Sequence, residues 1–193
     1  MSGDIHIRRE GRAGRITLTR PKALNALSWD MVRAIDAALI DWADDPEMDL
    51  LVIDAEGERA FCAGGDIVEM YETGTAGDFD YGRRFWRDEY RMNARMFQFP
   101  KPVATFLQGF TMGGGVGVGG GGSRTAGVGG CVIAWSSSRR RKDVLELVAQ
   151  DVEELEHVAL LAEADERLIR ARVAEGQAEA ARRKGRLLRV AQH

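Results

Sequence analysis

The chain has 193 residues, of which 45% are apolar and 30% charged, and this composition fits one globular domain, or one domain with an appendage, that buries a substantial core. A net charge of -3 gives no reason to expect nucleic acid or an anionic membrane surface as a partner, and no apolar run is long enough to cross a bilayer. Two widely spaced cysteines make neither a disulfide framework nor a zinc site, so we expect a cytoplasmic protein without a metal. Residues 1–9 carry charges and no apolar signal core, so we expect no cleaved leader.

Strand-like and helix-like patterns alternate along the first half of the chain. Residues 5–7 and 16–18 alternate apolar and polar side chains, which predicts a hairpin with one buried face. Ser28 is placed to cap a helix whose apolar residues recur at helical spacing as far as Trp42. The further predicted elements are a strand buried on both faces over 50–53, helices over 67–71 and 85–97, and a strand over 103–107. This alternation favours an α/β fold.

The composition changes near Ser123. Glycine dominates from Gly119 to Gly130 without a clear period, the apolar segment 131–135 has the length of a short strand, and serines and arginines follow it. From Asp143 the chain is rich in Ala, Glu, Arg and Leu, with apolar residues at the spacing of an amphipathic helix and nearly balanced charges. We therefore predict a domain over residues 1–123, a Gly/Ser/Arg-rich junction over 124–142 and a charged, amphipathic helical arm over 143–193.

Two glycine-rich turns follow predicted buried strands, at Ala63–Asp66 and at Met112–Gly115. Where glycine removes the side chain, a ligand can approach the backbone closely. If both turns open helices, their free N–H groups point at one ligand, and two such donors make an oxyanion hole for the carbonyl of a thioester. The spacing alone is also consistent with two plain tight turns.

Other kinds of site fit the sequence poorly. Gly115–Gly120 satisfies the G-x-G-x-x-G pattern of dinucleotide-binding proteins, but no acidic residue stands about 20 positions further on, and no Gly-Lys-Ser/Thr of a P-loop follows. The three histidines have no metal-ligand spacing. Cys62 lies beside the first glycine turn without a histidine to activate it, so we expect a small buried thiol.

Three ordered segments resemble motifs of the crotonase superfamily. Arg20–Leu27 is similar to the loop that holds the adenine end of coenzyme A, Ala60–Ile67 resembles the first oxyanion motif, and Gly109–Gly117 resembles the second. The resemblance covers about residues 5–123 and implies a core of repeated ββα units, incomplete here and followed by a helical C-terminal arm. Coenzyme A is part of the substrate in this superfamily, so no separate cofactor is expected.

Within the superfamily, the chain is most similar to 3-hydroxyisobutyryl-CoA hydrolases. The segments Cys62–Asp66 and Arg87–Tyr90 resemble that branch, and Gly117 stands where enoyl-CoA hydratases usually carry a catalytic glutamate. The resemblance implies hydrolysis of 3-hydroxyisobutyryl-CoA, or of a similar short branched acyl-CoA, in valine breakdown. Two alternatives stay open, namely an enoyl-CoA hydratase or isomerase, and a non-catalytic scaffold with an oligomerisation helix. The expected partner is the acyl-CoA substrate, with a homo-oligomer as a further option and neither nucleic acid nor a membrane.

The resemblance also assigns site residues. It implies that Gly65 and Gly114 supply the two oxyanion N–H groups and that Glu89 is an acidic residue in contact with the substrate. The further candidate substrate-binding residues are Ala23, Leu24, Ala63 and Asp66. Read without the family, Asp66 after a glycine pair is typical of a helix cap, and Glu89 is typical of a solvated carboxylate on a helix.

The family pattern is lost beyond Ser123. The hydrolase family places a catalytic glutamate in a Pro-Glu-Thr motif after the glycine triplet, whereas residues 133–140 contain neither proline nor glutamate, and Asp143 lacks the surrounding motif. We therefore expect the chain to bind acyl-CoA weakly and to hydrolyse it poorly. Because the break falls inside a motif, a deletion or a reading-frame change explains it better than a fusion of two domains.

Overall fold

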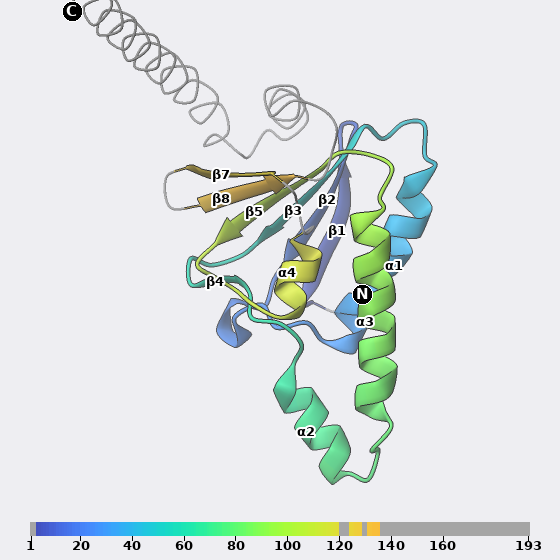
Figure 1. Cartoon of the computed structure of the whole chain (residues 1–193), viewed down its shortest axis with the longest axis vertical. Helices are drawn as coiled ribbons and strands as arrows, with labels where there is room; N and C mark the ends of the chain where they lie inside the picture. The colour runs from blue at the N-terminus through green and yellow to red at the C-terminus, as the bar shows by residue number, and fades with distance from the viewer. Residues whose placement is uncertain (1–2, 120–123, 129–130, 136–193) are drawn as a thin grey trace, which may run out of the picture. The chain divides into compact units, whose positions relative to one another are not determined.

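A computed structural model describes residues 3–119, 124–128 and 131–135, and in it the secondary structure repeats as ββα units (Figure 1). The first unit contains β1 (Ile5–Glu10), β2 (Ala13–Leu18) and α1 (Trp29–Ala43). The second contains β3 (Leu50–Ala55), β4 (Ala60–Cys62), α2 (Ile67–Thr75) and the longer α3 (Tyr81–Phe97). The third contains β5 (Val103–Gln108), β6 (Phe110–Thr111) and α4 (Gly114–Val118). The predicted α/β fold with a repeated ββα core is confirmed.

The strands form one six-stranded sheet, in the order β1-β2-β3-β5-β8-β7, and a small two-stranded ribbon of β4 and β6. Strands β2, β3 and β5 run parallel to one another, while β1 pairs with β2 in the antiparallel sense. The run Leu50–Ile53 is fully buried, as a central parallel strand requires, because helices or other segments cover both of its faces. The predicted hairpin over 5–18 and the predicted strands over 50–53 and 103–107 are therefore confirmed. The expectation that the hairpin has one buried face is wrong for β2, which is buried on both faces because β1 and β3 flank it inside the sheet.

Two helices cover one face of the sheet and hold the core. In Figure 1, α1 and α3 lie side by side against the strands. The hydroxyl of Ser28 caps α1 by accepting a hydrogen bond of 3.3 Å from the Met31 N–H, which satisfies one of the free amide groups at the helix start. The buried apolar residues of α1 pack on alternate residues of the strands, such as Ile16 and Ile53. The helices predicted from Ser28, over 67–71 and over 85–97 are confirmed, and the last two extend further than expected.

The sheet continues beyond residue 123. β7 (Arg124–Val128) and β8 (Cys131–Trp135) pair with each other in the antiparallel sense, and β8 pairs with β5. The sequence predicted β8 only as an option and did not predict β7, because Arg124–Val128 lies within a glycine-rich segment and shows no apolar alternation. Part of the predicted junction over 124–142 thus belongs to the sheet. The rest of that junction and the predicted arm over 143–193 lie outside the described residues, so the domain boundaries stay predictions.

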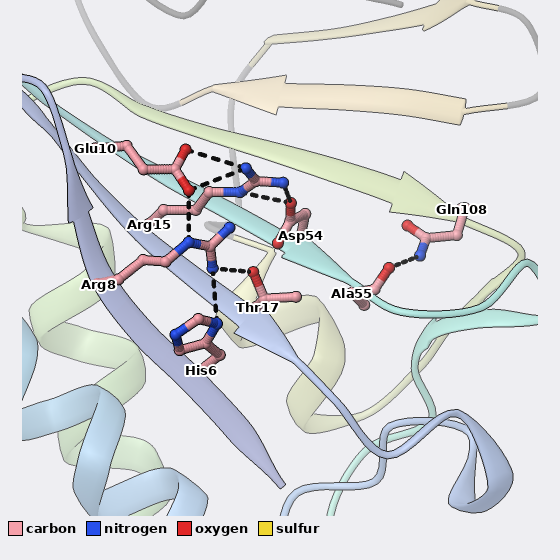
Figure 2. A network of polar contacts seen from close by, with 8 residues as sticks. All are labelled: His6, Arg8, Glu10, Arg15, Thr17, Asp54, Ala55 and Gln108. Atoms are coloured by element: carbon pink, nitrogen blue, oxygen red, sulfur yellow. Dashed lines mark hydrogen bonds and ion pairs between the residues drawn. The ribbon is translucent and has the colours of Figure 1, made fainter. Parts of the chain in front are cut away.

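A polar network ties three strands together, and a separate hydrogen bond joins a fourth strand to them (Figure 2). The Arg15 guanidinium on β2 donates to Asp54 Oδ2 on β3 over 2.9 and 2.6 Å, and to Glu10 Oε2 on β1 over 3.0 Å. Next to it, Gln108 on β5 donates to the carbonyl of Ala55 over 2.6 Å. Successive residues of a strand point to opposite faces, so Arg15 lies on the face of the sheet away from the Ile16 side chain. No helix of the described residues is both long and apolar enough to span a membrane.

Candidate active site

The loop of residues 20–27 is shaped by one buried asparagine. After a short 3-10 helix (η1, Pro21–Ala23), Leu24 and Asn25 adopt left-handed backbone angles, with φ of 52° and 54°. Asn25 is fully buried, accepts a hydrogen bond from the Arg20 N–H, and donates to the carbonyls of Glu56 and Ala60, all over 2.9 Å. Asparagine tolerates the left-handed region better than most residues, so it both turns the loop and anchors it to β4. The sequence motifs gave this residue no role of its own.

Three backbone hydrogen bonds join this loop to the first glycine turn. The Ala63 N–H donates to the Leu24 carbonyl over 3.0 Å, and the Leu27 N–H donates to the Gly64 carbonyl over 2.8 Å. The Asp66 N–H closes the set by donating to the Leu27 carbonyl over 2.9 Å. Ala63 and Leu24, two of the predicted substrate-binding residues, are therefore neighbours, and Ala23 is exposed at the start of the same loop.

The two glycine turns meet backbone to backbone. β4 and β6 pair just before them, and the Met112 N–H donates to the Cys62 carbonyl over 3.0 Å. A methyl group on Gly64 would lie 3.5 Å from the Gly114 nitrogen, and Gly64 and Gly113 have φ of 102° and 52°. Side chains are strained at such angles, so glycine at both positions lets the turns approach each other.

The N–H groups of Gly65 and Gly114 are the two donors that the family resemblance assigned to the oxyanion hole. No hydrogen bond found among the described residues uses either group. Gly114 is the first residue of α4, so its N–H has no acceptor within the helix. On either side of Gly65, the Gly64 carbonyl and the Asp66 N–H form hydrogen bonds with Leu27. The N–H of Gly65 itself takes no part in these bonds. The structure thus brings two free donors to adjoining turns, where both residues are partly exposed.

Asp66 serves the local structure. One carboxylate oxygen accepts the N–H groups of Val68 and Glu69 over 3.0 and 3.2 Å, which caps α2, and the other pairs with the Arg20 guanidinium over 2.8 Å. Burial alone would raise the pKa of Asp66, but the Glu69 N–H and the Arg20 guanidinium lower the pKa below its usual value. With both oxygens occupied, Asp66 matches the helix-cap interpretation better than the predicted contact with substrate, which stays a prediction.

Glu89 is buried against the second glycine turn. Its side chain leaves α3 toward α4, and a side chain on Gly114 would overlap its Oε1 atom. The residue is only 6% exposed, and Oε1 has no hydrogen-bond partner among the described residues. Burial raises the pKa of this carboxyl. The alternative of a solvated carboxylate is wrong. A buried carboxyl with a raised pKa beside a turn with a free N–H donor is a candidate for proton transfer.

Asn93 lies one helical turn after Glu89, and the sequence motifs missed it. A side chain on Gly117 would overlap its carboxamide, whose Oδ1 atom is buried without a partner among the described residues. Its only signal in the sequence is the spacing of four from Glu89, which places both residues on one side of α3. The position that holds a glutamate in hydratases is thus a glycine here, with an amide from another helix next to it.

Cys62 carries a free, buried thiol. Burial raises the pKa of its thiol to about 11, and the neighbouring Glu89 adds to that shift. The thiol is therefore neutral at physiological pH and is no nucleophile. This agrees with the prediction of a small buried thiol. The described residues contain no cluster of His, Cys, Asp or Glu suited to a metal ion.

Comparison with known proteins assigns this arrangement to a family. Residues 13–127 match the model of the enoyl-CoA hydratase/isomerase family. The chain belongs to this family. The predicted membership of the crotonase superfamily is thereby confirmed, and the match ends four residues beyond the predicted limit at residue 123.

Curated relatives are named 3-hydroxyisobutyryl-CoA hydrolase, mitochondrial. The protein of Gallus gallus is 44% identical over 117 residues, which are 61% of this chain and 30% of that relative. The human protein is 42% identical over 115 residues, again 60% of this chain and 30% of the relative. The chain thus spans less than a third of the length of these relatives. Their names place them in mitochondria and lend no support to a cytoplasmic location for this chain, which stays a prediction.

Solved structures carry other names. An enoyl-CoA hydratase from Rhodobacter sphaeroides 2.4.1 is 63% identical, with a TM-score of 0.58 over 60% of this chain and 34% of that protein. A carnitinyl-CoA dehydratase from Mycobacterium thermoresistibile is 43% identical, with a TM-score of 0.58 over 61% of this chain and 34% of that protein. All these relatives are named for acyl-CoA chemistry, and they differ in the reaction.

Proposed function

We propose that this chain binds an acyl-CoA thioester and hydrolyses it, with 3-hydroxyisobutyryl-CoA or a similar short branched acyl-CoA as substrate. The observation that carries the proposal is the juxtaposition of the unused Gly114 N–H with the buried Glu89 carboxyl. The second free N–H, on Gly65, lies on the adjoining turn. The names of the curated relatives support the choice of substrate.

The proposed chemistry uses the two N–H groups and the carboxyl in different ways. The thioester carbonyl oxygen accepts hydrogen bonds from Gly65 and Gly114, which stabilise its developing negative charge by about 3 kcal/mol for each donor. Water bonds to the carbonyl carbon while Glu89 takes its proton, and then the C–S bond breaks and coenzyme A leaves as a thiolate. A raised pKa makes Glu89 a better base than an ordinary surface carboxylate.

Hydration of an enoyl-CoA is the second candidate, because the solved structure at 63% identity is named an enoyl-CoA hydratase. That reaction in its usual form needs an additional glutamate at position 117, and glycine at this position transfers no proton. Hydrolysis with a single carboxyl therefore fits the described residues better. We expect slow turnover, because residues 133–140 lack the Pro-Glu-Thr motif of the hydrolases. The proposal requires no cofactor apart from coenzyme A in the substrate.

A direct assay separates the candidates. The purified full chain is incubated with 3-hydroxyisobutyryl-CoA, and the released thiol is followed; crotonyl-CoA is offered separately, and the loss of its double bond is followed. We expect thiol release that falls by about 100-fold or more in Glu89→Gln, which keeps the shape and removes the base. The matched control is Glu72→Gln, on an exposed glutamate of α2, which should keep full activity.

Three results would contradict the proposal. Hydration of crotonyl-CoA faster than thiol release would favour the hydratase. Unchanged hydrolysis in Glu89→Gln would remove Glu89 from the mechanism. Absence of both turnover and binding of the substrate would support the non-catalytic scaffold.

A further inference from the structure

The side of α3 that faces α4 carries two buried oxygen atoms that no other described residue uses. They are Oε1 of Glu89 and Oδ1 of Asn93. Each side chain lies where a side chain of α4 would otherwise be, Glu89 against Gly114 and Asn93 against Gly117. The glycines of α4 therefore make room for a polar pair contributed by the neighbouring helix. The proposed function uses Glu89 and leaves Asn93 without a role.

Asn93 presents the flat face of its carboxamide to α4. A Cβ atom on Gly117 would overlap its Oδ1, Cγ and Nδ2 atoms to the same degree, so the plane of the carboxamide lies flat over the glycine. A structural asparagine such as Asn25 instead meets several backbone groups edge-on. Asn93 thus closes position 117 to any side chain, while its own oxygen stays unpaired.

An unpaired buried oxygen is costly, by about 1–3 kcal/mol. Native proteins keep such groups at few places, and a binding site is one of them, since a ligand then supplies the missing partner. No donor among the described residues reaches Asn93 Oδ1. A hydrogen-bond donor on the bound substrate would supply the missing partner of Asn93 Oδ1.

The position of Asn93 indicates which part of the substrate supplies that donor. Four residues of an α-helix advance about 6 Å, so Asn93 lies roughly one turn along α3 from Glu89, which contacts Gly114. A group at that separation is within reach of a substituent on the acyl chain of a thioester bound at Gly114. A neutral amide suits a neutral partner, and a hydroxyl group can both donate and accept, so it matches the carboxamide in either orientation.

We propose that Asn93 is a specificity-determining residue, which binds a hydroxyl group on the acyl chain and thereby selects hydroxyacyl-CoA over the corresponding acyl-CoA. This inference rests on the proposed function, because it requires an acyl-CoA in the site. It also explains why residue 117 is a glycine, because the absence of a side chain there leaves the space that the Asn93 carboxamide fills.

Equilibrium binding tests the inference without any turnover. The probes are two non-hydrolysable analogues in which a methylene group replaces the thioester sulfur, one of 3-hydroxyisobutyryl-CoA and one of isobutyryl-CoA, titrated calorimetrically into the full chain. We expect the hydroxylated analogue to bind about 5-fold more tightly, as one net hydrogen bond implies. Asn93→Leu, which is similar in size, should lose this preference. Its affinity for the isobutyryl analogue should stay within about 2-fold of that of the unchanged chain.

A second variant guards against misfolding. Asn93→Ala only removes atoms, so it should fold even if leucine does not fit, and it should also lose the preference. Equal binding of both analogues to the unchanged chain would overturn the inference and leave the proposed function standing, as would a preference that persists in both variants. If the unchanged chain bound neither analogue, the proposed function would fail and this inference with it.

Discussion

Two acidic residues of the site, Asp66 and Glu89, show how partners decide what a carboxylate does. Burial by itself would raise the pKa of both carboxyls. At Asp66 the Glu69 N–H and the Arg20 guanidinium outweigh burial, and the residue stays ionised and structural. At Glu89 burial is the cause that sets the pKa, which is raised, so the carboxyl holds its proton more strongly. The first side chain stabilises the fold, while the second lowers stability and is available for chemistry.

Replacing Glu89 should therefore stabilise the protein. A carboxyl with a raised pKa in the folded state lowers stability as pH rises from the unfolded value of about 4.3 through the folded value. Glu89→Gln removes this effect. At pH 7 we therefore expect urea unfolding to give a free energy of unfolding that is about 1 kcal/mol larger than for the unchanged protein. At pH 4 the two proteins should be equally stable. A less stable variant at pH 7 would show that the Glu89 charge is compensated in the fold.

The opposite sign applies to Asp66. Its lowered pKa contributes stability that is present above the unfolded value of about 3.9 and is lost as pH falls through the folded value. Asp66→Asn keeps an oxygen for the helix cap and loses the ion pair with Arg20, so it should cost less than 1 kcal/mol at pH 7. Asp66→Ala loses both and should cost about 2 kcal/mol. Thermal unfolding measured from pH 7 to pH 3 should show the Asn variant approaching the unchanged protein; a constant gap would contradict the role of the charge.

Single residues differ in how far the sequence could predict them. Gly65 and Gly114 lie in sequence motifs, so a resemblance to a family is enough to predict their role. Asn25 and Asn93 act through contacts with segments distant in the chain, at Ala60 and at Gly117. No local pattern records such contacts, so only the folded structure shows them.

At the scale of elements, α4 is an improbable helix. Three of the five residues of Gly114–Val118 are glycines, each of which disfavours a helix by about 1 kcal/mol relative to alanine. Close contacts with Glu89, Cys62 and Asn93 explain why alanine is absent. The same contacts hold the N-terminus of the helix, with its free N–H, in place.

The cost of a side chain in α4 can be measured. Gly117→Ala should lower the unfolding free energy by about 1–3 kcal/mol, because the added methyl group overlaps the Asn93 amide. Adding Asn93→Ala should recover most of that loss, giving a favourable coupling in a double-mutant cycle. The control is Gly74→Ala in α2, where no atom lies within 4 Å of the added group. Additive losses in the cycle would mean that the two residues do not interact.

Elements also differ in what the sequence reveals. Helices with apolar residues at regular spacing, such as α1 and α3, were predicted at nearly the right place. β7 was not, because its residues form a strand through backbone pairing with β8. Pairing of that kind depends on the neighbouring strand more than on the composition of the strand itself.

At the scale of the whole molecule, the polar network on the sheet joins strands of the first and second ββα units, and the Gln108 hydrogen bond adds a strand of the third. Breaking the network should be costly, because Asp54→Ala would remove a carboxylate that lies 2.6 Å from the buried Arg15 guanidinium. We expect a loss of about 3 kcal/mol in urea unfolding. Asp36→Ala breaks a more exposed ion pair with Arg95 and should cost less than 1 kcal/mol. Similar losses in the two variants would show that burial of the network adds nothing.

The pairing of β4 with β6 makes the two glycine turns one mechanical unit. The Met112 N–H donates to the Cys62 carbonyl, and a methyl group on Gly113 would lie 3.5 Å from the Gly64 Cα, so the two turns pack directly against each other. If a thioester binds as proposed, its carbonyl oxygen meets both N–H donors on turns that are already joined, so engaging the second donor requires no further ordering of the backbone. Under that proposal, binding at Gly65 and binding at Gly114 are thermodynamically linked, and each favours the other.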